Sequence, residues 1–167
     1  MKCVSIGRRT AAGACLAAAW SCGRKKVAGY PGYAFVANED GMAVAAVDLE
    51  TFTLARRIPL DGKPTSVVAH PARDAVYVLT PATGTLHELA ASGLAHRRKS
   101  RLARGAVSMR LAPDGAALWV LCHDPRELQR VDIDSLRPSQ RIPLNAAPVS
   151  FDLSEREAKA AVGHEDG

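Results

Sequence analysis

The chain has 167 residues, of which 47% are hydrophobic, so it can supply the core of a folded domain. It carries 22 Lys and Arg against 17 Asp and Glu, a formal net charge of +5. Three of the basic residues, Lys2, Arg8 and Arg9, precede Cys22 in a stretch without acids, so the rest of the chain is only weakly basic. This balance argues against a nucleic-acid-binding surface, and we predict no nucleic-acid partner.

Residues 1–21 have the pattern of an export signal. The basic start precedes an apolar stretch at 10–20, shorter than the roughly 20 apolar residues that a membrane-spanning helix needs. Ala19-Trp20-Ser21-Cys22 then resembles a bacterial lipobox, in which the cysteine becomes lipidated. We therefore predict a signal peptide at 1–21, lipid attachment at Cys22, a linker at 22–29 and a location in the bacterial cell envelope (periplasm or outer membrane, lipid-anchored). Cys15 is a second candidate for the lipid, and export without lipid and no export stay open as alternatives.

The cysteine count argues against a disulfide framework. Cys3 and Cys15 would leave with the signal, and a lipidated Cys22 leaves Cys122 without a partner. Cys122 follows a strand-like apolar run at 118–121. This context favours a buried thiol that packs as a small hydrophobic side chain over a reactive nucleophile.

From residue 30 to residue 167 the sequence repeats with a period of 42 residues, which indicates a repeat architecture. Units begin near Ser66, Ser108 and Ser150. An aromatic residue precedes a valine at three corresponding positions, namely Phe35, Tyr77 and Trp119, and we expect these aromatic side chains to fill the layer between units. Corresponding positions two or three periods apart include Val47-Asp48-Leu49 and Val131-Asp132-Ile133, Arg57-Ile58-Pro59-Leu60 and Arg141-Ile142-Pro143-Leu144, and Glu39-Asp40-Gly41 and Glu165-Asp166-Gly167.

Short apolar runs separated by turn residues predict four strands in each unit. In the third unit these runs are 107–112, 117–122, 128–133 and 138–144. Pro113-Asp114-Gly115 is a turn sequence, because proline presets its φ angle, aspartate bonds its own backbone and glycine accepts positive φ. The segment 154–157 falls in the register of this turn and is therefore interpreted as a loop, although it looks helical in isolation.

Four antiparallel strands in about 40–45 residues are typical of a β-propeller blade. The chain resembles the YVTN β-propeller repeat proteins of prokaryotic cell envelopes over residues 30–167. The resemblance is carried by Phe35-Val36-Ala37-Asn38, Tyr77-Val78-Leu79-Thr80, the Val44–Asp48 strand, Arg57-Ile58-Pro59-Leu60 and the turn Ala112-Pro113-Asp114-Gly115. It implies an all-β fold of four-stranded antiparallel blades, here about 3.3 units of a ring that usually has about 4–8 blades.

We therefore expect an incomplete ring, either a part of a longer propeller or an arc that assembles with others. Open blade edges would favour self-association of the chain.

The second unit departs from the repeat. Ala90 stands where the other units have Asp48 and Asp132, and residues 97–104 contain five basic side chains. The simplest interpretation is a solvated outer strand that its charge protects from aggregation. Attraction to anionic lipid headgroups or to another acidic surface is the alternative.

Residues for chemistry are sparse. The five histidines, His70, His87, His96, His123 and His164, show no metal-ligand or haem-attachment spacing. His70 is expected in a turn before Pro71, whereas His123 and His164 fall close to corresponding loop positions that could line a pocket. The acids Glu39, Asp40, Glu165 and Asp166 are interpreted as repeated polar turns. No catalytic, phosphate-binding or dinucleotide motif is present, so we predict no catalytic residues, no metal and no cofactor.

Three functions fit these observations. The favoured one is a non-catalytic, lipid-anchored envelope propeller that binds a protein or a small ligand at its propeller face or serves as a scaffold. The alternatives are a fragment of a lactonase-like enzyme and a fragment of a redox-associated propeller, similar to quinoprotein dehydrogenases or nitrite reductases. Since one fold carries many functions, the resemblance indicates architecture better than activity.

Overall fold

The computed structural model describes residues 29–154 and 159–165, and its regular structure is entirely β-strand. In this part of the chain no helix is long and apolar enough to cross a membrane. The strands form four antiparallel sheets, which we call blades 1–4. Blade 1 contains β1 (Tyr33–Asn38), β2 (Ala43–Asp48) and β3 (Thr53–Pro59); blade 2 contains β4 (Ser66–Ala69), β5 (Val76–Thr80), β6 (Thr85–Ala90) and β7 (Ala95–Arg101); blade 3 contains β8 (Ala106–Leu111), β9 (Ala117–His123), β10 (Arg126–Asp132) and β11 (Arg137–Pro143); blade 4 contains β12 (Pro148–Leu153) and β13 (Ala160–His164).

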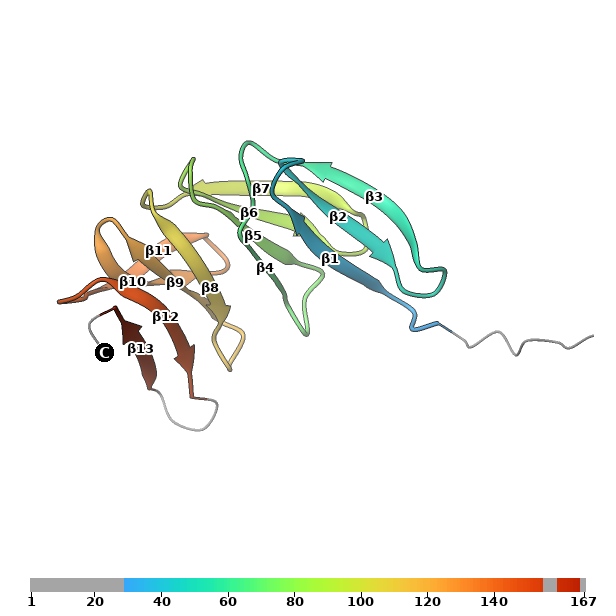
Figure 1. Ribbon diagram of the computed structural model, residues 1–167. Helices are drawn as coiled ribbons and strands as arrows, with labels where there is room; N and C mark the ends of the chain where they lie inside the picture. Colours follow the sequence, from blue (N-terminus) through green and yellow to red (C-terminus); the bar gives the residue numbers. More distant parts are fainter. Residues whose placement is uncertain (1–28, 155–158, 166–167) are drawn as a thin grey trace, which may run out of the picture.

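The blades follow one another in an arc, with blade 1 at one end and blade 4 at the other (Figure 1). The first strands of successive blades, β4, β8 and β12, lie side by side, and a hydrogen bond from Thr65 Oγ1 to the carbonyl of Val107 (3.3 Å) joins positions one repeat apart. The described sheets do not close into a ring. The predicted all-β, four-stranded repeat is therefore confirmed, and so is the incomplete ring.

The strands of the third unit begin and end within two residues of the predicted runs. The turn at Ala112–Gly115 closes the β8–β9 hairpin with a hydrogen bond from the Gly115 amide to the Ala112 carbonyl (2.8 Å), and Gly115 has a φ of +69°. Only glycine adopts this left-handed backbone without strain. Ser154 lies in irregular structure after β12, whereas 155–158 lie outside the described residues.

Three apolar clusters form the core, one at each junction between blades. The junction of blades 1 and 2 buries Val44, Val76, Val78, Leu89 and Leu94. One repeat later, the junction of blades 2 and 3 buries the corresponding side chains, including Leu86, Leu118, Val120, Val131 and Leu136. The third cluster, around Leu121, Leu128 and Phe151, has fewer buried members. The same positions thus build each junction, and the last one is only partly filled.

The aromatic positions follow this pattern. Tyr77 is buried between blades 2 and 3, as predicted, whereas Phe35 and Trp119 are partly buried against the first and third clusters.

The turn before the last strand of a blade (β2–β3, β6–β7 and β10–β11) is held by an aspartate. Asp48 accepts hydrogen bonds from the amides of Glu50 (2.7 Å) and Thr51 (3.0 Å), and Asp132 accepts one from the amide of Ser135 (2.8 Å). Such bonds replace the strand pairing that the turn interrupts. In blade 2, where Ala90 occupies this position, Asp74 of the preceding hairpin accepts the hydrogen bond from the Ser92 amide (2.6 Å). Backbone amides lower the pKa of all three carboxyls.

Candidate polar ligand site between blades 1 and 2

A cluster of polar side chains lies where the chain passes from blade 1 to blade 2. Asp61 belongs to the connection between β3 and β4, and His87, on β6, is almost completely buried. The Nε2 atom of His87 lies 3.0 Å from Oδ1 of Asp61 and 3.1 Å from Oγ1 of Thr80. Its Nδ1 atom lies 3.0 Å from Nε2 of His96, and Nζ of Lys99 lies 3.0 Å from Oδ2 of Asp61. Pro59, Leu60, Asp61, His87, His96 and Lys99 line a small cavity of about 290 Å³ at this point.

A β-bulge places the two β7 side chains on the same face. Lys99 pairs with His87 and His96 pairs with Leu89, so Arg97 is an extra residue between them. Residues three apart in a regular strand point to opposite sides of the sheet, and the inserted residue reverses that relation. His96 and Lys99 therefore both lie on the side of blade 2 that carries His87 and faces blade 1.

The contacts of Asp61 determine the tautomers of both histidines. The carboxylate can only accept, so Nε2 of His87 carries the hydrogen, and Nδ1 of the neutral ring is an acceptor. This acceptor requires that Nε2 of His96 carries the hydrogen of their shared bond. The lone pair of His96 then resides on Nδ1, for which no hydrogen-bond partner occurs among the described residues. The hydrogen bonds that link Asp61, His87 and His96 thus leave a hydrogen-bond acceptor, Nδ1 of His96, at an exposed side chain of β7.

The electrostatics agree with a neutral His87. Burial lowers the pKa of His87, although the Asp61 carboxylate opposes this shift. Burial of Asp61 would raise its pKa, but the hydrogen bond and charge of Lys99 and the hydrogen bond from Thr83 act in the opposite direction, and the pKa of Asp61 is lowered. The site therefore combines a carboxylate, an ammonium group and two imidazoles. Within the described residues no group of three or more potential ligands is arranged to hold a metal ion.

The two histidines of this cluster are not part of the repeat, whereas Lys99 matches the basic residues Arg57 and Arg141. The positions that correspond to His87 are Ala45 and Gln129, and those that correspond to His96 are Leu54 and Pro138. In blade 3 the buried Gln129 donates to Glu127 instead. Sequence reasoning considered both histidines only for metal spacing and missed the cluster. The signal that was available is the change of residue type at fixed repeat positions.

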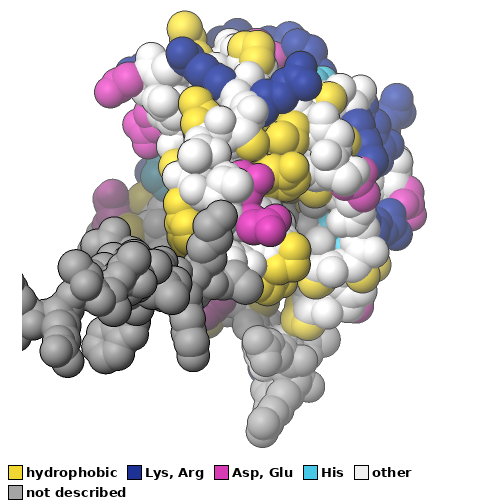
Figure 2. Space-filling model, turned by 90° about the vertical axis from the view of Figure 1, so that its right-hand side faces the viewer, with side chains coloured by type: hydrophobic (Ala, Val, Ile, Leu, Met, Phe, Trp, Pro, Cys, Tyr) yellow, Lys and Arg dark blue, Asp and Glu magenta, His cyan; other side chains and the backbone are white. Residues whose placement is uncertain are grey.

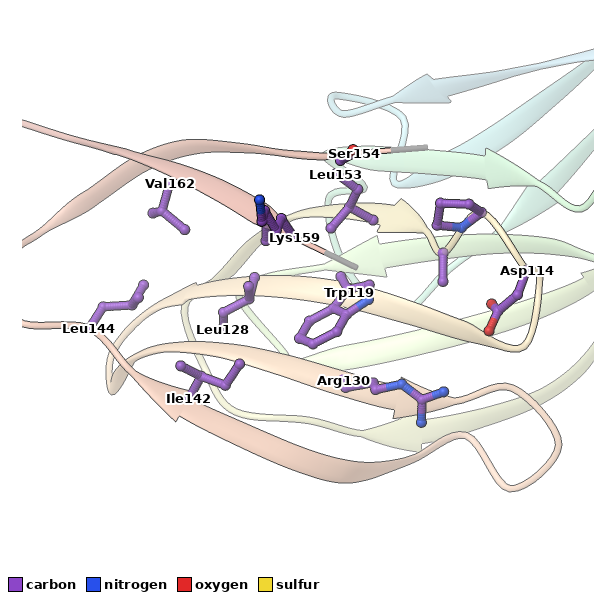
Figure 3. Close-up of a pocket in the computed structure, with 13 residues that line it drawn as sticks. Asp114, Trp119, Leu128, Arg130, Ile142, Leu144, Leu153, Ser154, Lys159 and Val162 are labelled. Atoms are coloured by element: carbon purple, nitrogen blue, oxygen red, sulfur yellow. The ribbon is translucent and has the colours of Figure 1, made fainter. Parts of the chain in front are cut away.

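A second, larger cavity of about 620 Å³ lies between blades 3 and 4, and we call it the groove. Trp119, Leu128, Ile142, Leu144, Leu153 and Val162 line its apolar part (Figure 3). Asp114, Ser154, Lys159 and Arg130 supply its polar lining. The apolar walls of the groove continue the third core cluster.

The other predicted residues are placed as follows. Cys22, the signal at 1–21 and most of the linker at 22–29 lie outside the described residues. Cys122 is fully buried, and burial raises the pKa of its thiol to about 12, as expected of a packing side chain. Neither His123, exposed on β9, nor His164, on β13, lines either cavity. Glu39, Asp40 and Glu165 are exposed, and Asp166 lies outside the described residues.

His70 is a turn residue, as predicted. Its Nδ1 atom accepts hydrogen bonds from the amides of Ala72 (3.0 Å) and Arg73 (2.9 Å). Nε2 must then carry the hydrogen, and it donates to the Gly115 carbonyl at 3.0 Å. This bond connects blade 2 to the β8–β9 turn of blade 3.

The basic run at 97–104 begins on the exposed edge strand β7, as predicted, but much of its charge is paired. Arg97 bonds Asp74, Arg98 bonds Glu88 (2.8 Å) and Lys99 bonds Asp61. Arg98 also donates to the Ile133 carbonyl of blade 3 (2.8 Å). These pairs arise because the acids lie on neighbouring strands and turns, which the linear sequence does not show.

No protein-family model matches the sequence, and no curated protein matches it either. Solved structures do match. Hydrazine synthase from Kuenenia stuttgartiensis has a TM-score of 0.69 at 16% identity, over 75% of this chain and 36% of that chain. A functionally unknown protein from Desulfotomaculum acetoxidans has a TM-score of 0.67 at 12% identity, over 74% and 40%. Apo AztD from Citrobacter koseri has a TM-score of 0.59 at 18% identity, over 69% and 32%.

The dihydro-heme d1 dehydrogenase NirN also matches, with a TM-score of 0.60 at 18% identity, over 66% of this chain and 25% of that chain. At these identities the comparisons show the fold alone, that of an incomplete β-propeller. The chain matches between a quarter and two fifths of the length of these solved chains.

Proposed function

We propose that this chain is part of an exported, membrane-anchored propeller that binds a small polar ligand at the Asp61–His87–His96–Lys99 site. The observation that carries the proposal is that this cluster interrupts the repeat. At the positions of Asp61, His87 and His96 the other blades have apolar or uncharged residues, whereas this blade has linked ionisable side chains next to a cavity. Lys99 keeps the basic residue of the repeat and is recruited to the cluster by its contact with Asp61. Perturbed titratable groups in a cleft favour a functional site over a purely structural one.

The chemistry of the site suggests the class of ligand. His96 offers an acceptor at Nδ1, and Lys99 uses one of its three donors on Asp61. Pro59 and Leu60 supply an apolar wall. A small carboxylate with a neighbouring hydroxyl or ammonium group would complement this arrangement, because the carboxylate accepts from Lys99 and the neighbouring group donates to His96.

Binding is tested by NMR of the histidine rings during titration with hydroxy and amino carboxylates, with acetate as the probe that lacks a donor. We expect saturable shifts of the His96 signals with the first class and weaker ones with acetate. His96→Phe should abolish the response, and His123→Phe, a change of an exposed histidine on β9, should leave it intact. If His96 does not respond to any carboxylate, the proposed ligand class is wrong.

The membrane anchor rests on the N-terminal sequence. When the whole chain is expressed in a bacterium and extracted with a detergent that separates into phases, the wild type should enter the detergent phase. Cys22→Ala should stay in the aqueous phase, whereas Cys15→Ala is the matched control and should behave as the wild type. The reverse result would assign the lipid to Cys15, and no partition of the wild type would rule out the anchor.

A redox-associated propeller is the second candidate, because two of the compared proteins are named as a hydrazine synthase and a dihydro-heme d1 dehydrogenase. His87 does not fit an axial haem position, because its one lone pair, on Nδ1, accepts the hydrogen bond from His96. Titration with hemin, followed by absorbance, should give no saturable binding under our proposal. Saturable binding at one haem per chain would favour the redox candidate.

A further inference from the structure

One turn residue is exposed in blade 1 and buried in blades 2 and 3. Phe52, Leu94 and Leu136 lie one repeat apart, each in the turn before the last strand of its blade. Their φ angles are +55°, +47° and +54°. A residue with a Cβ atom adopts this backbone only where the surroundings favour it. Leu94 is 9% exposed and Leu136 is 1% exposed, because each packs against the preceding blade, whereas Phe52 is 75% exposed.

The face around Phe52 is the one that the other blades bury. Val36 is 50% exposed, although Val78 and Val120 at the corresponding positions are inaccessible to solvent. Leu54, next to this turn, is also exposed. The end of the molecule formed by blade 1 shows hydrophobic side chains between charged ones (Figure 2). We call this surface the blade 1 face. Its exposed apolar side chains are of the kind that the other blades bury against the preceding blade.

The groove at the other end lacks the side chains that such a face supplies. At the closed junction of blades 2 and 3, Tyr77 and Leu86 contact a cluster that contains Val131, Ile133 and Leu136. Trp119 and Leu128, one repeat later, line the groove. The residues of blade 1 that correspond to those three side chains are Val47, Leu49 and Phe52. The blade 1 face therefore carries the side chains that would fill the groove.

Strand β1 also corresponds to β13. Both follow the same repeat register, with Ala34 matching Ala160 and Val36 matching Val162, and both lead into the sequence Glu-Asp-Gly. β13 pairs only with β12 among the described strands. If β1 of another molecule pairs with β12 in place of β13, then β12, β1, β2 and β3 make a complete four-stranded blade. β13 then leaves the wall of the groove, and Val36 of β1 takes the place of Val162 there.

We propose that two copies of this chain associate head to tail, so that the blade 1 face of each copy fills the groove of the other. Of the described strands, each copy then contributes blades 2 and 3 and half of two shared blades, which makes six blades, within the range of about 4–8 in closed propellers. The two interfaces are equivalent and close the ring, which prevents open-ended growth. The polar site between blades 1 and 2 does not take part in this contact. The experiments on assembly and on ligand binding can therefore each contradict one proposal without affecting the other.

The test is light scattering on the full chain with Cys22→Ser, which removes any lipid contribution, over a range of concentrations. We expect a dimer. Phe52→Asp should give a monomer, because it places a charge in the buried centre of the interface, and Ile142→Asp should do the same from the groove side. Both residues are exposed within one chain, so the circular dichroism and the unfolding midpoint of the monomer should stay near the wild-type values.

Met42→Asp is the matched control, because Met42 is an exposed apolar residue of blade 1 in the β1–β2 turn, outside the core clusters. It should remain dimeric. A mixture of Phe52→Asp and Ile142→Asp should recover a dimer, since one of the two interfaces is then unaltered. A wild-type monomer at all concentrations, a dimer that survives Phe52→Asp, no recovery in the mixture, or larger open assemblies would each overturn the proposal.

Discussion

The closed junction between blades 2 and 3 and the open groove between blades 3 and 4 use corresponding residues in different environments. Leu118 and Val120 are inaccessible to solvent in the first, whereas their counterparts Ala160 and Val162 line the second. Burial in this fold is therefore a property of the neighbouring blade as much as of the residue itself, because no blade can bury both of its faces alone.

The largest expected difference is in thiol reactivity at one repeat position. Cys122 lies in the closed junction, and His164 occupies the corresponding position at the open end. The background is a chain with Cys3, Cys15 and Cys22 changed to Ser. In this background the native Cys122 should react with a disulfide reagent more than about a thousandfold slower than the cysteine introduced by His164→Cys. Part of this factor follows from the pKa of about 12, since each unit above the ordinary value of 9.0 lowers the thiolate fraction tenfold.

The rates are measured by absorbance in native buffer, with urea-unfolded protein as the reference. Equal native rates at the two positions would mean that the two junctions are equally accessible, which contradicts the comparison.

The second difference is in stability. Leu118→Ala should lower the free energy of unfolding by about 2–5 kcal/mol, because it leaves a cavity in a closed core. Ile142→Ala in the groove should cost less than about 1 kcal/mol in the monomer, because its side chain already contacts solvent. Both losses are measured by urea unfolding of the two variants, each in a chain that also carries Phe52→Asp and is therefore monomeric. A larger loss for Ile142→Ala would show that the groove is filled within one chain.

The third prediction concerns the polar cluster and pH. The pKa of His87 is lower in the folded state, so the unfolded chain binds more protons below its ordinary pKa of about 6.5. Stability should rise with pH through this window and fall as pH drops from about 6.5 towards the folded pKa, by at most about 1.4 kcal/mol per pH unit. Burial of His87, together with Asp61, His96 and Lys99, the ionisable groups that face it, sets the position of this window.

His87→Gln, which installs the residue of blade 3, should remove this contribution, and His123→Gln should not. The check is the urea midpoint measured between about pH 5 and 7. An unchanged slope in His87→Gln would mean that His87 is not the group that titrates.

The smallest effect is expected for Lys99→Met. Lys99 is exposed, and its ion pair with Asp61 is half in solvent, so unfolding free energy should change by less than about 1 kcal/mol. Carboxylate binding at His96, by contrast, should weaken clearly, which separates the ligand role of this residue from its structural one. Differential scanning calorimetry and the NMR titration provide the two readouts. A large loss of stability would indicate that the ion pair is structural.

The strands could be predicted because the repeat sets them in register. Turn sequences such as Pro113-Asp114-Gly115 act locally, and the apolar positions recur with the blade. The polar cluster could not be predicted in the same way. Asp61 and His87 are brought together by the passage from one blade to the next, and His96 reaches them through a bulge that its own sequence does not reveal. The burial of Cys122 was predicted from its strand, whereas the exposure of Phe52 depends on the absence of a neighbour among the described blades.

The position of Asp74 has a consequence for how such proteins diverge. In blade 2 the turn has Ala90 in place of the aspartate of the other blades, and a carboxylate from another hairpin, Asp74, holds the same amide and also binds Arg97. A structural role can therefore pass from one sequence position to another while the backbone stays the same. Ancestral motifs then erode faster than the architecture they once specified. A count of blades by motif in related sequences will consequently be a lower bound, and blades with decayed signatures should be sought by spacing.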